Sequence, residues 1–190
     1  MPLPCCVPGR RPTHRPWTQA DAPSLHAAFA ADPSLEQQLG CRLDDVGQAA
    51  GYLETALADS PQRRSFAVDM DGTAVGNIGI SAIDRRHQTA WVSYWLAPSA
   101  RGHSLASRGV AAAAGWALGD GGLFRLELGH RTNNPASCRV ALNAGFRPEG
   151  IERSKLRYGR ERFDVETHAR LDPVPKISAL PLQSPGPSTS

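Results

Sequence analysis

The stretch TAWVSYWLAPSARGHSLA, residues 89–106, decides how the rest of this chain is interpreted. Thr89–Leu96 is apolar or aromatic on both faces, which is typical of a strand inside a sheet rather than at its edge. Pro98 ends this strand, because proline has no N–H to donate to a ladder. The small-residue loop 101–106 then leads into an alanine-rich helix that ends near Gly119. The N-terminus of such a helix has unpaired N–H groups and partial positive charge, which favours binding of an anion such as a pyrophosphate, although an ordinary strand-to-helix connection uses similar residues.

The segments on either side of this stretch predict alternating strands and helices. Asp71-Gly72 lies between two runs of alternating polarity and indicates a tight hairpin. Asn134, Pro135 and Gly145 are typical of the cap, the first residue and the end of a helix. The other expected elements, in chain order, are a strand at 13–16, a helix begun by Thr18 and Asp21, a helix at 44–57, strands at 65–70, 73–83 and 124–130, a helix at 135–143, and a closing hairpin of 146–153 and 162–171.

Composition limits the class of protein. A chain of 190 residues with 41% hydrophobic residues is long enough for one domain with one sizeable core. Its net charge of only +3 argues against a dedicated nucleic-acid-binding module. The sequence has neither a long apolar run nor a basic-then-apolar N-terminal segment, so we expect no membrane partner and a cytoplasmic location. The Pro-rich residues 1–12 and the Pro/Ser-rich residues 173–190 are expected to be disordered tails.

Cysteine spacing predicts no metal site. Cys5 and Cys6 are adjacent, Cys41 and Cys138 are isolated, and no CxxC pair or Cys/His spacing typical of zinc ligands occurs.

Three groups of residues resemble the GNAT superfamily of N-acetyltransferases. RGHSLA, residues 101–106, is similar to the acyl-CoA-binding signature Arg/Gln-x-x-Gly-x-Gly/Ala, with Arg101 and Ala106 matching. RLELGHRTNNPASCRVALNAGFRPEG, residues 125–150, resembles the asparagine-helix-Gly-Phe block of the same superfamily. RPWTQAD, SYWLAPSARG and GFRPEG resemble the RimJ/RimL type, which acetylates N-terminal amines of ribosomal proteins.

The resemblance implies an α/β fold for residues 13–172, which would form the acetyltransferase domain. A mixed, mostly antiparallel twisted sheet of about seven strands would be flanked by about four helices. The sheet would split in a V after Leu96, and the protein would be a monomer or a homodimer.

The resemblance also implies acetyl-CoA as cosubstrate, with an amine acceptor and no metal. The cosubstrate-binding residues would be Leu96, Ala97, Arg101, Gly102, His103, Ser104, Leu105, Ala106 and Asn134. Ser104 departs from the family pattern, which has glycine there. If that position needs a positive φ, serine is strained there by about 1 kcal/mol.

Catalytic candidates follow from the same resemblance. The family often has a tyrosine acid seven residues after the asparagine, but here that position is Ala141, so Ser137 is the candidate proton donor. Glu127, on the strand beside the expected cleft, is the candidate base, although a solvated surface carboxylate explains it equally well. Tyr94 is expected to be core or cleft wall. Neither Cys138 nor Ser104 has an evident partner base in the sequence, which favours direct attack by the amine in a ternary complex.

Three other functions stay open at this point. The acceptor could be a small-molecule amine rather than a protein N-terminus. Ser104 and Ala141 make a non-catalytic acyl-CoA-binding protein conceivable. GHSLA, residues 102–106, is close to the nucleophile elbow of serine hydrolases, and Asp164 and His168 follow it in the required order.

Overall fold

The computed structural model describes residues 13–172, and in this range the chain forms a seven-stranded sheet in the order β1-β2-β3-β4-β5-β7-β6, with five α-helices. The expected tails, 1–12 and 173–190, lie outside the described residues. The strands are β1 (Thr13–Pro16), β2 (Arg64–Met70), β3 (Thr73–Asp84), β4 (Thr89–Leu96), β5 (Arg125–Arg131), β6 (Arg147–Tyr158) and β7 (Glu161–Leu171). The helices are α1 (Ala22–Ala31), α2 (Ser34–Leu39), α3 (Val46–Thr55), α4 (Leu105–Leu118) and α5 (Pro135–Asn143), with 3-10 turns at Gln19–Asp21 and Pro98–Ala100.

The predicted order of elements is confirmed, with one addition. The short helix α2, Ser34–Leu39, was not predicted, because six residues give fewer than two turns and too little periodicity to recognise. The structure therefore has five α-helices where about four were expected. Asp71 and Gly72 both have positive φ, 52° and 86°, as the hairpin between β2 and β3 requires.

Two apolar clusters cover opposite faces of β4. Val92 and Leu96 pack with α4 and Phe146 in the larger cluster, whereas Trp95 and Ala97 pack with α1 and α3 in the smaller one. This alternation follows from the two-residue period of a strand and explains why Thr89–Leu96 is apolar on both faces. None of the helices in residues 13–172 is long and apolar enough to cross a membrane.

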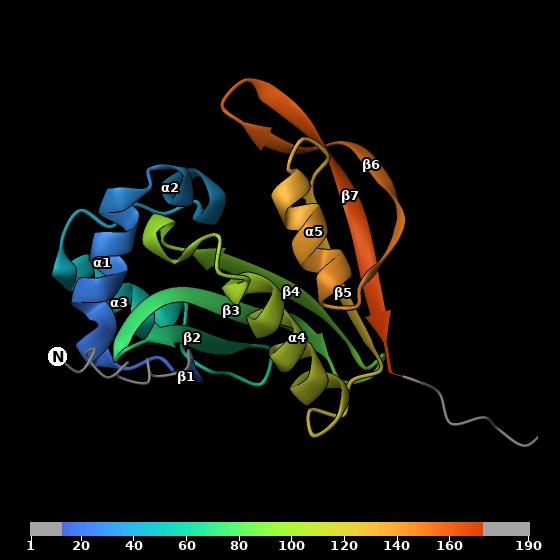
Figure 1. The fold of residues 1–190 in the computed structure, drawn as a ribbon, viewed down its shortest axis with the longest axis horizontal. Coiled ribbons are helices and arrows are strands. Elements are labelled where there is room, and N and C mark those ends of the chain that lie inside the picture. Colours follow the sequence, from blue (N-terminus) through green and yellow to red (C-terminus); the bar gives the residue numbers. More distant parts are fainter. Residues whose placement is uncertain (1–12, 173–190) are drawn as a thin grey trace, which may run out of the picture.

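The sheet divides between β4 and β5. These parallel strands pair only from Thr89–Trp91 to Arg125–Glu127, and beyond that point they diverge into two wings (Figure 1). The family resemblance implied a split after Leu96, but pairing ends at Trp91, five residues earlier along β4. The split begins earlier because each strand has another partner: β4 stays paired with β3 through Leu96, and β5 stays paired with β7 through Arg131.

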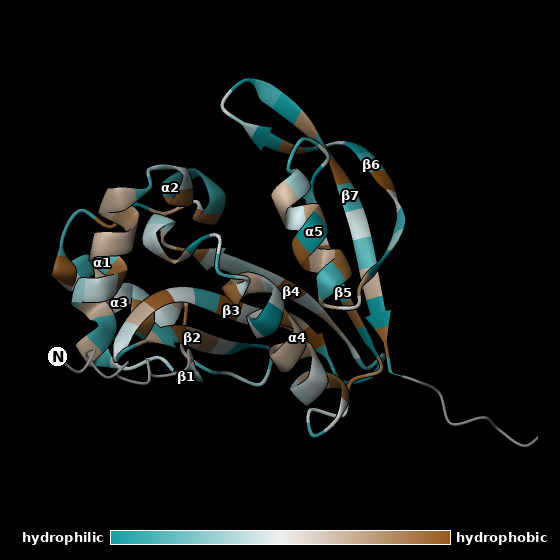
Figure 2. Cartoon of the chain, viewed as in Figure 1, coloured by the Kyte–Doolittle hydropathy of each residue, from teal (hydrophilic) through white to brown (hydrophobic). Residues whose placement is uncertain are grey.

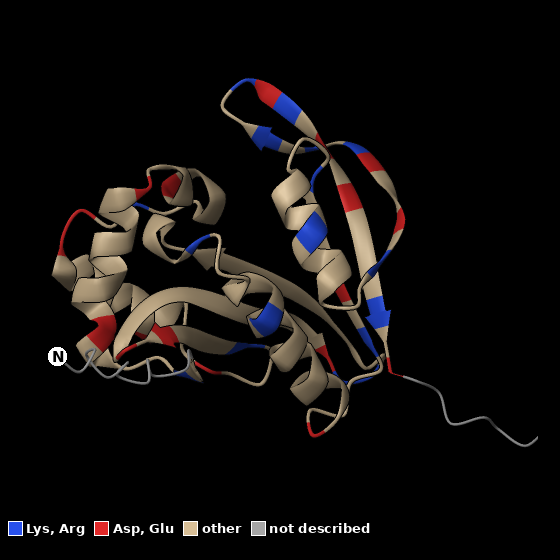
Figure 3. Ribbon diagram, viewed as in Figure 1, with Lys and Arg blue, Asp and Glu red and all other residues tan. Residues whose placement is uncertain are grey.

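The far wing ends in a polar edge. β6 is exposed along most of its length, and Figure 2 shows the β6–β7 hairpin largely hydrophilic. Lysine, arginine and acidic residues alternate along the same hairpin in Figure 3. Charged side chains on an edge strand oppose pairing with another chain, which protects this exposed edge.

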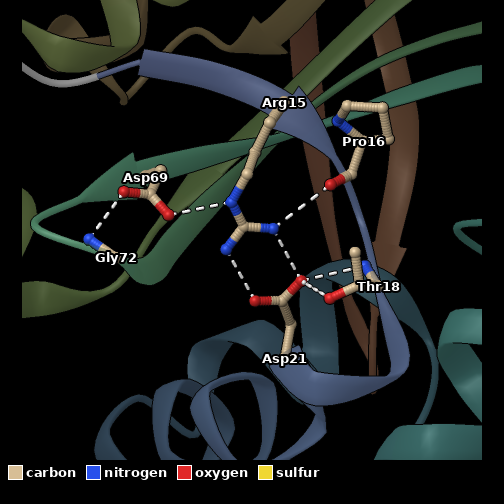
Figure 4. A network of polar contacts seen from close by, with 6 residues as sticks. All are labelled: Arg15, Pro16, Thr18, Asp21, Asp69 and Gly72. Atoms are coloured by element: carbon tan, nitrogen blue, oxygen red, sulfur yellow. Dashed lines mark hydrogen bonds and ion pairs between the residues drawn. The ribbon is translucent and has the colours of Figure 1, made fainter.

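A partly buried ion-pair network connects the N-terminal strand to the rest of the fold (Figure 4). The Arg15 guanidinium donates two hydrogen bonds to Asp21, at 2.8 and 2.7 Å, and one to Asp69 at 2.9 Å. Asp21 also accepts from the N–H and hydroxyl of Thr18, both at 2.9 Å. These contacts connect β1 to β2 and to the start of α1. The hydrogen bonds from Arg15 hold the pKa of Asp21 below its usual value.

Replacing Asp21 with asparagine should lower the free energy of unfolding at neutral pH by about 1–3 kcal/mol, the range for hydrogen bonds to charged groups. The pKa of Asp21 is lowered in the folded state, so its contribution is complete above the unfolded value of 3.8 and is lost as the pH falls through the folded value. Urea unfolding of wild type and Asp21→Asn should therefore differ at neutral pH and converge in acid. Asp120→Asn, at an exposed loop position, is the matched control, and equal stability of all three proteins at neutral pH would refute the prediction.

Candidate active site

A cavity of about 620 Å³ lies in the V between the two wings. It is bounded on one side by β4 and the loop before α4, and on the other by β5 and the first half of α5. Residues of α2 and of the β6–β7 hairpin line its outer end. Of the residues expected to bind the cosubstrate, the cavity is lined by Leu96, Arg101, Gly102, Ser104, Leu105, Ala106 and Asn134.

The edge of β4 that faces this cavity has backbone groups outside any β4–β5 pairing. The Ala97 N–H donates to Val75 O at 2.8 Å, so in this antiparallel pair the odd-numbered residues bond β3 and the even-numbered ones face the opposite edge. Side chains confirm the direction, because Gln38 donates to the Tyr94 carbonyl at 3.3 Å and Arg101 to the Leu96 carbonyl at 3.0 Å. The N–H groups of Tyr94 and Leu96 therefore point to the same edge, past the last paired residue, Trp91.

The loop before α4 has the backbone of an anion-binding turn. Gly102 and Ser104 both have positive φ, 83° and 56°, and α4 begins at Leu105. Ser104 caps α4 with left-handed backbone, but its side chain makes no capping hydrogen bond. The position does require a positive φ, as the family glycine indicates, so serine carries conformational strain here.

Three residues that were predicted to bind the cosubstrate differ from the others, because they lie outside the cavity lining or already have partners within the protein. The N–H of Ala97 is taken by β3, and His103 is exposed and does not line the cavity. Arg101 lines the cavity, but its guanidinium donates to the Leu96 carbonyl and forms an ion pair with Asp32. Arg101 therefore ties the end of β4 to the segment between α1 and α2.

Asn134, Ser137 and Tyr94 meet across the cavity. Asn134 caps α5, as predicted, and its Oδ1 accepts from the Ser137 N–H at 3.1 Å. The Tyr94 hydroxyl donates to Ser137 Oγ at 2.9 Å. Burial raises the pKa of Tyr94, and the hydrogen bond to Ser137 offsets part of that rise, so the phenol is protonated at neutral pH. Tyr94 was expected in the core or the cleft wall and does line the cavity, but its contact with Ser137 was not predicted, because only the splayed wings bring β4 opposite α5.

Glu127, the candidate base, does not join Asn134, Ser137 and Tyr94 in the cavity. It lies in the paired part of β5, opposite Trp91, and does not line the cavity. Arg125 donates to Glu127 Oε1 at 2.6 Å and also pairs with Glu149. The structure thus places Glu127 in a surface ion-pair cluster rather than beside Ser137.

The residues of the hydrolase alternative are not assembled. Asp164 accepts from the Ser154 N–H at 2.7 Å, and His168 contacts His130 and Glu166 on the far wing. Ser104 has no hydrogen bond to either residue in the described structure. Cys138 does have histidines nearby, contrary to the sequence expectation: its sulfur lies within 4.8 Å of the His130, His168 and Glu166 ligand atoms. Cys138 does not line the cavity, however.

Comparisons with known proteins agree with this geometry. The Acetyltransferase (GNAT) domain family matches residues 11–147, and the chain belongs to this family. The uncharacterized N-acetyltransferase YoaA of Bacillus subtilis (strain 168) is 24% identical over 163 residues, covering 84% of this chain and 92% of YoaA. The ribosomal-protein-serine acetyltransferase of Escherichia coli (strain K12) is 29% identical over 108 residues, 57% of this chain and 60% of that protein.

A solved structure shares the fold. Mycobacterium smegmatis RimJ in complex with CoA-disulfide superposes with a TM-score of 0.75 at 24% identity, over 83% of this chain and 80% of that one. The predicted fold class and superfamily are thus confirmed, and the protein is an acyl-CoA-dependent acetyltransferase.

Replacing Ser104 with glycine should relieve the left-handed strain and raise the free energy of unfolding by up to about 1 kcal/mol. Turnover and the KM for acetyl-CoA should be retained or improved. Ser107→Gly, inside α4 where glycine is unfavourable, is the control and should destabilise the protein. Loss of turnover in Ser104→Gly, with CoA binding intact by calorimetry, would instead identify Ser104 as a nucleophile.

Proposed function

We propose that the protein transfers the acetyl group of acetyl-CoA to the N-terminal amine of a protein by direct attack in a ternary complex. The observation that carries this proposal is the free edge of β4 beyond Trp91, next to the turn at 102–104. The similarity to a ribosomal-protein-serine acetyltransferase supports a protein rather than a small molecule as acceptor.

The residues of the cavity suit acetyl-CoA as cosubstrate. The N–H groups at the start of α4 face the position for the pyrophosphate, where a left-handed turn without bulky side chains lets phosphates approach the backbone. The edge N–H groups of Tyr94 and Leu96 are positioned to pair with the amides of the pantetheine arm, as an added strand would. An N–H at this edge would also stabilise charge on the thioester carbonyl oxygen as the amine attacks.

The Tyr94–Ser137 pair would supply the proton for the departing thiolate. The amine nitrogen bonds to the carbonyl carbon and loses one proton to solvent, the carbon–sulfur bond breaks, and the sulfur takes up the phenol proton of Tyr94, which the tyrosine regains from solvent. A phenol held protonated by burial, 2.9 Å from Ser137 Oγ, is a suitable donor. This assigns Ser137 the role of orienting Tyr94, rather than that of sole donor.

The acceptor would enter from the outer end of the cavity. Ser34, Leu35, Gln37 and Gln38 of α2 line that end, opposite Lys155 and Tyr158 of the hairpin. The segment between α1 and α3 is therefore the part of the chain that would select the acceptor.

A panel assay tests the function. Purified protein with acetyl-CoA is offered peptides with free N-termini, the same peptides with blocked N-termini and a free lysine, and small amines including polyamines and amino acids, with free thiol as readout. We expect thiol release that depends on a free peptide α-amine, and mass spectrometry should find one acetyl group there. Turnover with small amines alone would contradict a protein acceptor, and absence of thiol release with every amine would contradict the activity.

Replacing Tyr94 with phenylalanine should lower kcat by about 100-fold, the lower end of the range for a general acid. The KM for acetyl-CoA should change by less than about threefold, because the lost interaction acts in the transition state. Tyr52→Phe removes another partly buried hydroxyl, which does not line the cavity, and is the control. An unchanged kcat in Tyr94→Phe would remove this tyrosine from the mechanism.

A further inference from the structure

Four potential metal ligands converge beneath α5, beside the cavity just described, and of the four only His130 also lines that cavity. His130 is on β5, Cys138 is on α5, and Glu166 and His168 are on β7. One ligand atom from each of the four lies within 4.8 Å of all the others. We propose that these four residues bind a zinc ion.

The strand register places three of the four ligands on one face of the paired strands β5 and β7. His130 pairs directly with Glu166 across β5 and β7, and His168 is two residues further along β7, on the same face of the sheet. α5 crosses this face and brings Cys138 over it. The sequence spacing contains no metal motif, because the ligands come together only through strand pairing and helix packing.

Three of the four ligand atoms are spaced nearly as the corners of a metal tetrahedron are. His130 Nε2 and His168 Nε2 lie 3.1 Å apart, and they lie 3.3 and 3.2 Å from Glu166 Oε2. Zinc bonds of about 2.0–2.2 Å to nitrogen and oxygen give tetrahedral edges of about 3.3–3.6 Å, so these separations are at or slightly below the lower end of that range, and Cys138 Sγ lies within 4.8 Å of all three atoms. Three atoms in an almost equilateral triangle of this size leave room for one small cation above its centre.

When both histidine rings are neutral, hydrogen bonds alone satisfy this triangle poorly. His130 Nδ1 lies 3.0 Å from the Arg131 carbonyl oxygen, which only accepts, so Nδ1 carries a hydrogen and the neutral ring has a lone pair at Nε2. That lone pair faces a carboxylate oxygen that is also an acceptor. A single proton on His168 Nε2 can make a good hydrogen bond to His130 Nε2 or to Glu166 Oε2, but not to both. A hydrogen bond from the other ring nitrogen to a backbone carbonyl is the usual support of a metal-bound histidine.

Burial and ligand type favour zinc over other divalent ions. The side chains of His130 and His168 are 4% and 1% exposed, and His168 Nδ1 has no hydrogen-bond partner among the described residues. Two imidazoles, a thiolate and a carboxylate are a donor set that suits zinc and disfavours magnesium and calcium. The thiolate and the carboxylate would neutralise the charge of the ion. The ion would then fasten α5, whose first turn holds Asn134 and Ser137, to the far wing.

Cobalt(II) titration of the full-length protein tests the proposal. Protein freed of metal by chelator and kept reduced by a phosphine should bind one equivalent of Co²⁺. The complex should show the visible bands of a tetrahedral ion and a near-ultraviolet thiolate-to-cobalt band, and zinc should displace it. Absence of bound cobalt, or six-coordinate spectra without a thiolate band, would overturn the proposal.

Two cysteines provide a matched comparison. Cys138 and Cys41 are both free and half-buried, but only Cys138 belongs to the cluster. Cys138→Ser should lose the thiolate band and weaken cobalt binding at least about tenfold, whereas Cys41→Ser should behave as wild type. Cys5 and Cys6 remain in both variants and do not account for a difference between them.

Glu166→Gln, at a partly exposed ligand, should weaken cobalt binding while keeping the thiolate band, and it provides a second variant if Cys138→Ser does not fold. An unchanged thiolate band in folded Cys138→Ser, or its equal loss in Cys41→Ser, would place the metal elsewhere and overturn the proposal.

Discussion

Backbone pairing that stops at Trp91 is the constraint on which the active site depends. β4 and β5 are central strands, yet they share only three residue pairs, from Thr89–Trp91 to Arg125–Glu127. Each keeps its other neighbour beyond that point, so the fold loses few hydrogen bonds when the wings diverge. The divergence creates the cavity and leaves the Tyr94 and Leu96 edge open to a ligand that can pair with backbone.

Several local features shape the opening between β4 and β5. Pro98 prevents β4 from continuing along the cavity, and the turn through Gly102 and Ser104 brings the N-terminus of α4 to its end. Arg101 and Gln38 occupy the carbonyls on the open edge and leave its N–H groups directed into the cavity. Asn134 fixes the first turn of α5 on the opposite wall, so Ser137 meets Tyr94.

Local patterns predicted most of the fold. The bounds of Thr89–Leu96 and Pro135–Asn143 were predicted as the structure has them, because proline, glycine and cap residues mark their ends. The positive φ expected at Ser104 followed from a family glycine position, and the structure has it. Contacts between segments distant in the sequence could not be predicted. The Tyr94–Ser137 hydrogen bond crosses the V and depends on the splay, whereas the His130–Cys138–Glu166–His168 cluster lies within the far wing and depends on strand register and helix packing. Glu127 was chosen from its strand position and the family resemblance, neither of which reveals that Arg125 pairs with it outside the cavity.

Amide hydrogen exchange along β4, with and without CoA, tests the open edge most directly. Binding of CoA should slow exchange at the Tyr94 and Leu96 amides by at least about tenfold, because each gains a partner. The Trp95 and Ala97 amides, which already pair with β3, should change little. Unchanged exchange at Tyr94 and Leu96 under saturating CoA would contradict the account, even if the amides at the start of α4 became protected.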